Sequence, residues 1–280
     1  MYARLLHVFR NTPLGRETLL QSVYFCRVVG VQLVIYVPEF TKFLMYFENE
    51  VVQVDLDNSY LKWPQTAVEH AGAIAEQGGV APEFFKPKEF TASTLPDVPT
   101  NFDFMSCPRS MSDLSSRVGL GHIGPRVRHI VRAAHFPVLI PSAVYKEWHS
   151  IAVFFGGSAN AARALKLGLR IHEATGLPID IFTQMEKDFQ HTYEQVIHDE
   201  NIKEDLENNI REWYRFETGS FEENLYEVPH DALVILGAYG HGVVREILFG
   251  SKMELIQSTI ANSLLIVGPK YKAVGWRWRR

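Results

Sequence analysis

The segment "GAYGHGVVREILFGS", Gly237 to Ser251, directly follows the apolar run Ala232 to Leu236. Its glycines and final serine have the spacing G-x2-G-x9-G-S. Glycine lets the backbone adopt positive φ and approach phosphate oxygens, and successive N–H groups in such a loop form an anion site. Ser251 is predicted to begin a helix, whose unpaired N–H groups and dipole suit a triphosphate. The segment therefore predicts a phosphate-binding loop between a strand and a helix.

A simpler interpretation is that Ser251 and Glu254 form only a capping box, S-x-x-E, at the start of that helix. A cap does not account for the upstream glycines Gly237 and Gly240. Lys252 falls in the first helical turn, where a cation opposes the dipole unless an anion lies nearby. The two interpretations are compatible, and the ligand interpretation is favoured.

Two stretches of the chain repeat one order of predicted elements. Beginning at Arg4 and again at Ser150, the pattern predicts a strand, a turn, a helix, a glycine and a second strand. Gly30 and Gly176 stand where a C-cap glycine ends a helix, and apolar residues resume at strand spacing directly after each. The two halves are therefore predicted to be copies of one structural unit.

Each half also ends in a short apolar run that is typical of a buried parallel strand, "FPVLIP" at 136–141 and "NSLLIVGP" at 262–269. A chain of 280 residues can bury two hydrophobic cores. Alternating strands and helices predict two tandem α/β domains, residues 1–144 and 145–280, each with an open, mainly parallel sheet. Ligands in such sheets bind beyond the carboxyl ends of the strands, where the strand order reverses.

Composition argues against several classes of partner. The net charge of -4 gives no electrostatic reason to expect nucleic acid or an anionic membrane as the main partner. No apolar run approaches the roughly 18 residues of a membrane span, and the stretch between Arg4 and Arg10 is too short for a signal peptide. Cys26 and Cys107 are predicted to be small buried apolar residues. We expect a cytoplasmic protein.

Motifs of dedicated catalysis are missing from the sequence. It has no G-x4-G-K-[ST], H-E-x-x-H or G-x-S-x-G motif. "GLGHIG", 119–124, matches G-x-G-x-x-G but follows a polar, serine-rich segment where a dinucleotide site needs a strand. The acidic run 199–207 is predicted to be the solvent-exposed face of a helix rather than a metal cluster. With no nucleophile and base in view, we expect no enzyme, and slow hydrolysis of a bound ligand stays open.

The strand, the G-x2-G-x9-G-S motif, the helix and "SLLIVGP" together resemble the nucleotide-binding type of universal stress protein, and two copies resemble its tandem members. The resemblance implies a Rossmann-like, adenine nucleotide alpha hydrolase-like fold in both domains. It also implies that the motif holds the ribose and phosphates of ATP, with or without magnesium. The predicted cofactor-binding residues are Gly156, Gly157, Ser158, Gly237, Gly240, Gly250, Ser251 and Lys252.

Two departures from the family pattern affect this prediction. The aspartate that the family has after its first strand is replaced by Gly156 in the second copy and by Arg10 or Asn11 in the first. Ser158 has the alternative role of capping the following helix. The first copy has "FMSCPRS" from Phe104 in place of a strand and G-x2-G, and Gly124-Pro125 in place of Gly-Ser. Proline removes an N–H donor but suits the first position of a helix. One nucleotide site, in the second domain, is predicted.

The sequence favours two classes of function over a third. The chain is predicted to be an ATP-binding stress-response or regulatory protein, or else a tandem interaction scaffold whose nucleotide site has decayed, and an ATP-consuming enzyme of related fold is the third alternative. An unknown regulatory protein partner and a homodimer stay open. The apolar runs Val138 to Ile140 and Leu264 to Ile266 lack the lysines and internal prolines that protect a sheet edge. We expect them to lie alongside each other in an internal pseudo-dimer.

Overall fold

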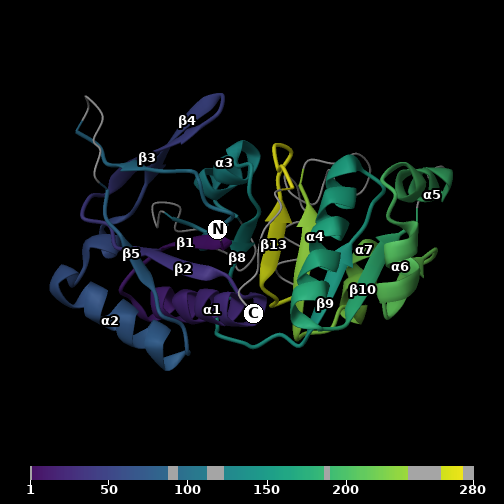
Figure 1. Ribbon diagram of the computed structural model, residues 1–280, viewed down its shortest axis with the longest axis horizontal. Helices are drawn as coiled ribbons and strands as arrows, with labels where there is room; N and C mark the ends of the chain where they lie inside the picture. The colour runs from purple at the N-terminus through teal and green to yellow at the C-terminus, as the bar shows by residue number, and fades with distance from the viewer. Residues whose placement is uncertain (1, 88–93, 112–122, 186–189, 239–259, 274–280) are drawn as a thin grey trace. The chain divides into compact units, whose positions relative to one another are not determined.

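The computed structural model describes residues 2–87, 94–111, 123–185, 190–238 and 260–273, with the backbone alone for 190–192. These residues form two compact units. The first ends at Glu147, and the second extends over Trp148–Ala273. In each unit, helices pack against parallel strands (Figure 1).

The first unit is built on parallel strands in the spatial order β5-β2-β1-β7-β8. These strands are β1 (Arg4–Val8), β2 (Gln32–Tyr36), β5 (Glu83–Phe85), β7 (Phe104–Ser106) and β8 (Val138–Ile140). Its helices are α1 (Pro13–Val29), α2 (Pro64–Gln77) and α3 (Pro125–Ala133), with a 3-10 turn η1 (Asn58–Leu61).

The second unit has parallel strands in the order β11-β10-β9-β12-β13. These strands are β9 (Ser150–Phe154), β10 (Ile179–Gln184), β11 (Glu212–Phe216), β12 (Ala232–Gly237) and β13 (Leu264–Val267). Its described helices are α4 (Ala159–Thr175), α5 (Gln190–Asp199), α6 (Lys203–Asn209) and α7 (Phe221–Asn224), with a 3-10 turn η2 (Leu225–Glu227).

Counted along each unit's own chain, both strand orders are 3-2-1-4-5. The order reverses between the first and fourth strands, which are β1 and β7 in one unit and β9 and β12 in the other. The predicted fold class, α/β with mainly parallel sheets, is confirmed. The pairing of Val138 to Ile140 with Leu264 to Ile266 stays a prediction.

Local capping signals determine where α1 and α4 begin and end. The hydroxyl groups of Thr12 and Ser158 each accept a hydrogen bond from the backbone amide three residues further on, at 3.1 Å in both cases. Gly30 and Gly176 end the helices in the left-handed region, with φ of 76° and 70°. Both predicted C-cap glycines are therefore confirmed.

Helix α4 lies unusually close to the sheet at Gly168. A Cβ atom there would lie 2.7 Å from Val153 Cγ2 and 3.2 Å from Ile179 Cδ1. The glycine lets the helix pack directly on β9 and β10, whose apolar residues are fully buried. This close packing holds α4 directly against the sheet.

The first unit also contains a small three-stranded sheet. Its strands are β3 (Lys42–Phe47), β4 (Glu50–Asp55) and β6 (Asp97–Val98), in the order β4-β3-β6. An ion pair of Arg126 with Asp55 and a hydrogen bond between His129 Nε2 and Glu50 Oε2 at 3.0 Å connect β4 to α3. These contacts attach the small sheet to helix α3.

The sequence interpretation placed no strand at Phe104, and this was wrong, because Phe104–Ser106 forms β7 between β1 and β8. All its residues are buried, including Ser106. The Oγ of Ser22 lies 2.8 Å from Ser106 Oγ and 2.9 Å from His7 Nδ1, so the polar strand residue has a buried hydrogen-bond partner. Burial lowers the pKa of His7 to about 3, so its imidazole is neutral at physiological pH.

The acidic run 199–207 does not lie on one helix as predicted. It includes the end of α5, a turn in which Asn201 has a φ of 53°, and most of α6. The left-handed conformation, which asparagine tolerates, separates the two helices. Glu204, Asp205 and Glu207 are exposed, which agrees with the predicted solvent-exposed surface. Across the described part of the chain, no cluster of three His, Cys, Asp or Glu could hold a metal ion.

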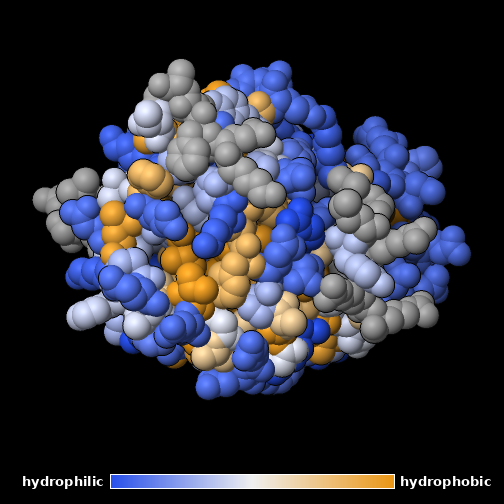
Figure 2. Space-filling model, turned by 60° about the vertical axis from the view of Figure 1, so that its left-hand side comes forward, coloured by the Kyte–Doolittle hydropathy of each residue, from blue (hydrophilic) through white to orange (hydrophobic). Residues whose placement is uncertain are grey.

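One face of the first unit carries an apolar surface (Figure 2). In this unit Phe40 and Val68 are 42% and 41% exposed, and with Phe84 and Phe85 they line a cavity of about 240 Å³. Nearby in sequence, Trp63 is 69% exposed and has a φ of 58°. Within the described ranges, no helix combines the length and the apolar character needed to cross a membrane.

The two cysteines are free and buried, as predicted. Cys26 and Cys107 are 2% and 0% exposed, and burial raises the pKa of both thiols. A protonated, inaccessible thiol is a packing residue rather than a nucleophile.

Candidate functional site

The predicted site begins where β9 and β12 end side by side in the second unit. Leu236 pairs with Phe154 in this parallel pair, so the loops that follow both strands leave the same edge of the sheet. Gly237 ends β12, and Gly156, Gly157 and Ser158 follow β9. The remaining predicted site residues, Gly240, Gly250, Ser251 and Lys252, lie outside the described residues, as do 119–122 of "GLGHIG".

Gly237 is required by packing against the first turn of α4. A Cβ atom at this position would lie 2.4 Å from the carbonyl oxygen of Asn160 and 2.7 Å from the backbone nitrogen of Ala161. No rearrangement of a flexible side chain could relieve these backbone contacts. The end of β12 can therefore approach α4 only with glycine here, and a ligand contact by Gly237 stays a prediction.

Two polar side chains of α4 hold the ends of β12 and β13, and the sequence analysis did not single them out. Asn160 Nδ2 donates to the carbonyl oxygen of Ala238, directly after β12. Arg163 Nη1 donates to Asn160 Oδ1 at 2.9 Å and to the carbonyl oxygen of Pro269 at 3.0 Å. Asn160 is only 7% exposed, so this linkage is buried. It fixes the point from which the glycine-rich segment leaves the sheet.

The Gly-Gly-Ser turn after β9 has a local structural role. Gly157 has a φ of 70°, a left-handed conformation that favours glycine. The Ser158 hydroxyl accepts from Ala161 N and so caps α4. Since a cap accounts for Ser158, the alternative role is confirmed for this residue, while ligand contacts by Gly156 and Gly157 stay predictions.

Aromatic rings and an amide pair stand beside the turn, toward β10. The Phe154 ring lies 6.0 Å from that of Phe182 and 6.1 Å from that of Phe221. Gln184, at the end of β10, accepts from Asn224 Nδ2 at 2.8 Å. Position 156 is a glycine and carries no carboxylate, so the described side chains next to the turn are aromatic rings and amides.

The corresponding edge of the first unit is filled by its own side chains. Arg10 Nη2 lies 3.5 Å from Asp57 Oδ2, and its guanidinium lies 5.5 Å from the centre of the Tyr60 ring. Asn11 Oδ1 lies 3.2 Å from His70 Nδ1. Helix α3 begins at Pro125, as predicted. An ion pair and aromatic contacts thus occupy the place where a ligand would bind in the second unit.

Solved structures with the same arrangement of elements include a universal stress protein from Archaeoglobus fulgidus DSM 4304, with a TM-score of 0.60 and 14% identity over 95% of this chain and 98% of that one. The chain has the universal stress protein fold. A protein named for the same family, from Pseudomonas aeruginosa UCBPP-PA14, has a TM-score of 0.56 and 10% identity, covering 96% and 94% of the two chains.

The universal stress protein fold also occurs in another setting. The cytoplasmic domain of a prokaryotic cation chloride cotransporter matches with a TM-score of 0.51 and 11% identity over 95% of both chains. At such identities the likeness extends to the fold alone. No family model and no curated protein matches the sequence.

Proposed function

We propose that the chain is a universal stress protein-type regulatory protein that binds ATP at the carboxyl edge of its second unit. One observation carries the proposal. The strand that leads into the G-x2-G-x9-G-S motif ends against the first turn of α4, at the place where the strand order reverses. Open α/β sheets bind their ligands at this place, and the glycine-rich motif that follows the strand would supply backbone N–H groups to a ligand there.

The start of α4 favours an anionic ligand. The helix has 17 residues, and the cap satisfies one of its first amides while leaving others directed at the carboxyl edge. Arg163 donates to an amide oxygen and to a backbone carbonyl oxygen, and it forms no ion pair with a carboxylate of the described residues. Phosphate groups held by the motif would therefore lie in a positive field.

We further propose one ATP per chain and no dedicated turnover. In the first unit, the Arg10–Asp57 ion pair fills the equivalent edge and Pro125 removes an N–H donor from the start of α3. In the second unit, the described residues at the β9 and β12 ends include no nucleophile beside a base. Slow hydrolysis by bound water is compatible with this proposal, and magnesium would accompany the phosphates.

The test combines the purified chain with one substitution in the motif. Mass spectrometry on nucleotide released by denaturation should detect ATP, and calorimetry with ATP and magnesium should give one site per chain. Gly240→Val should abolish binding, because valine restricts φ and fills the anion site. Gly72→Ala is the matched control, since a Cβ in α2 would make only an ordinary 3.8 Å contact with Phe84. Two equivalent sites, or unchanged affinity in Gly240→Val, would contradict the proposal.

A tandem interaction scaffold is the second candidate. It is favoured by the glycine at position 156, which removes the aspartate of the family pattern, and by the occurrence of this fold in the cytoplasmic domain of a transporter. A chain that copurifies with no nucleotide and does not bind added ATP would support this candidate. Turnover of ATP to a defined product would instead support an enzyme.

A further inference from the structure

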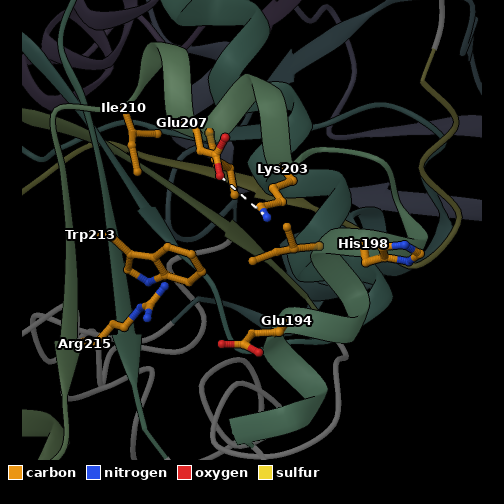
Figure 3. Close-up of a pocket in the computed structure, with 9 residues that line it drawn as sticks. Glu194, His198, Lys203, Glu207, Ile210, Trp213 and Arg215 are labelled. Atoms are coloured by element: carbon orange, nitrogen blue, oxygen red, sulfur yellow. Dashed lines mark ion pairs between the residues drawn. The ribbon is translucent and has the colours of Figure 1, made fainter.

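The second unit contains a cavity away from the predicted nucleotide site. It has a volume of about 620 Å³ and lies between α5, the segment from α6 to Ile210, and the edge strand β11 (Figure 3). This size is in the range of small-molecule sites. None of its lining residues belongs to the carboxyl-edge site, so an inference about it is independent of the proposed ATP binding.

The floor of the cavity is apolar. Ile197 and Leu206 are 6% and 4% exposed, and Ile210 and Trp213 complete the surface. The indole N–H of Trp213 donates to Thr183 Oγ1 at 2.9 Å, within the sheet. Because its only polar atom already has a partner, Trp213 presents carbon atoms to the cavity.

The rim carries charged and polar side chains, and several of them contact one another. Lys203 Nζ lies 3.8 Å from Glu207 Oε1, one helical turn away. His198 Nδ1 lies 3.4 Å from Asp199 Oδ1. These contacts leave two rim groups without an ion pair to any described residue, the Glu194 carboxylate on α5 and the Arg215 guanidinium on β11.

Glu194 and Arg215 stand on opposite walls. Figure 3 shows the Glu194 carboxylate directed toward the side of the cavity where Arg215 and Trp213 lie. The Arg215 Cζ atom lies 4.0 Å from the centre of the Trp213 ring, so the guanidinium lies over the face of the indole. Stacking leaves the in-plane N–H groups of arginine available to a carboxylate.

We propose that this cavity binds a zwitterionic ligand with an apolar body, of the class of short apolar peptides. Its carboxylate would bind Arg215, its ammonium group would bind Glu194, and its side chains would cover Ile197, Leu206 and Trp213. Such a ligand bridges two opposite charges that are too far apart to pair directly. It also removes apolar floor from water, which supplies the affinity, while the two charges set the orientation.

The experiment is calorimetry on the full chain with the dipeptide L-leucyl-L-phenylalanine as the probe. We expect one site with a Kd of about 1 mM or tighter. The N-acetylated and the C-terminally amidated dipeptides, which lack one charge each, should bind about fivefold more weakly, as expected for partly exposed ion pairs. Absence of binding, or equal affinity for all three compounds, would overturn the proposal.

Two substitutions test which side chain binds each charged group of the ligand. In Arg215→Gln the amidated and the free dipeptide should bind equally, and in Glu194→Gln the acetylated and the free dipeptide should bind equally. Glu212→Gln is the control, because this exposed carboxylate is on β11 but does not line the cavity. Thermal unfolding confirms that each variant is folded. The assignment is refuted if the free dipeptide still binds more tightly than the amidated one to Arg215→Gln, or than the acetylated one to Glu194→Gln. It is also refuted if Glu212→Gln loses these differences in affinity.

Discussion

The Asn160 side chain donates a hydrogen bond to the carbonyl oxygen of Ala238, 78 residues further along the chain. This contact ties the first turn of α4 to the exit of β12, where the glycine-rich segment begins. The hydrogen bond therefore positions the start of the segment that is proposed to bind the ligand.

Replacement of Asn160 by alanine should therefore affect stability and ATP binding together. The Ala238 carbonyl would lose its buried partner, which costs about 1–3 kcal/mol of unfolding free energy. ATP affinity, measured by calorimetry, should fall because the exit of β12 is no longer fixed. Asn209→Ala is the control, since the Asn209 amide bonds only to a local carbonyl on exposed α6. Equal effects of the two substitutions would contradict the role given to Asn160.

Sequence patterns predicted the features that depend on neighbours in the chain. Gly30, Gly176 and Ser158 cap helices through contacts within a few residues, so composition and spacing sufficed to place them. The repeated order of elements likewise predicted the parallel sheets, because strand, helix and strand in succession allow few other arrangements.

Features that depend on distant contacts were not predictable in this way. Strand β7 has three residues and ends in Ser106, and only its burial between β1 and β8 makes it a strand. Arg163 bonds to the Pro269 carbonyl, 106 residues away, and no local signal marks that partner. The cavity beside Trp213 arises from three separate elements, so no single motif indicates it.

Gly176→Ala should destabilise the second unit for a purely conformational reason. Its φ is 70°, and a Cβ atom would meet nothing within 4 Å, so no clash contributes. An L-residue in this conformation costs roughly 1–2 kcal/mol. Gly72→Ala, inside α2, should instead raise stability by up to about 1 kcal/mol, since alanine favours helix. Urea unfolding measures both, and effects of the same sign would count against this account.

Trp63→Gly should leave stability unchanged or raise it by up to about 1 kcal/mol. Trp63 is 69% exposed and adopts a φ of 58° and a ψ of 50°, which is unfavourable for a non-glycine residue. Tyr226→Gly provides the contrast, because Tyr226 is 66% exposed in a 3-10 turn of ordinary conformation. That substitution should lower stability by about 0.5–1 kcal/mol. Equal losses from both would show that Trp63 makes stabilising contacts that outweigh its backbone conformation.

Stability of the first unit should depend on pH through His7. Its pKa is lowered by burial to about 3 in the folded chain, from the ordinary value of 6.5, so below pH 6.5 the unfolded chain binds a proton that the folded chain does not. This proton uptake by the unfolded chain lowers the unfolding free energy. The loss is absent above about pH 7 and grows as pH falls toward 3. At pH 5 the unfolding free energy should be about 2 kcal/mol lower than at pH 8 through this residue alone.

The variant His7→Gln separates this effect from that of the carboxylates. Glutamine does not titrate and can still hydrogen-bond to Ser22, which lies 2.9 Å from His7 Nδ1. Urea unfolding of both proteins between pH 5 and pH 8 should show a steeper decline for the native chain, with curves that converge in slope above pH 7. Carboxylate contributions are common to both proteins and cancel in the difference. Parallel curves over the whole range would mean that His7 takes up a proton in the folded state, contrary to its burial on β1 against α1.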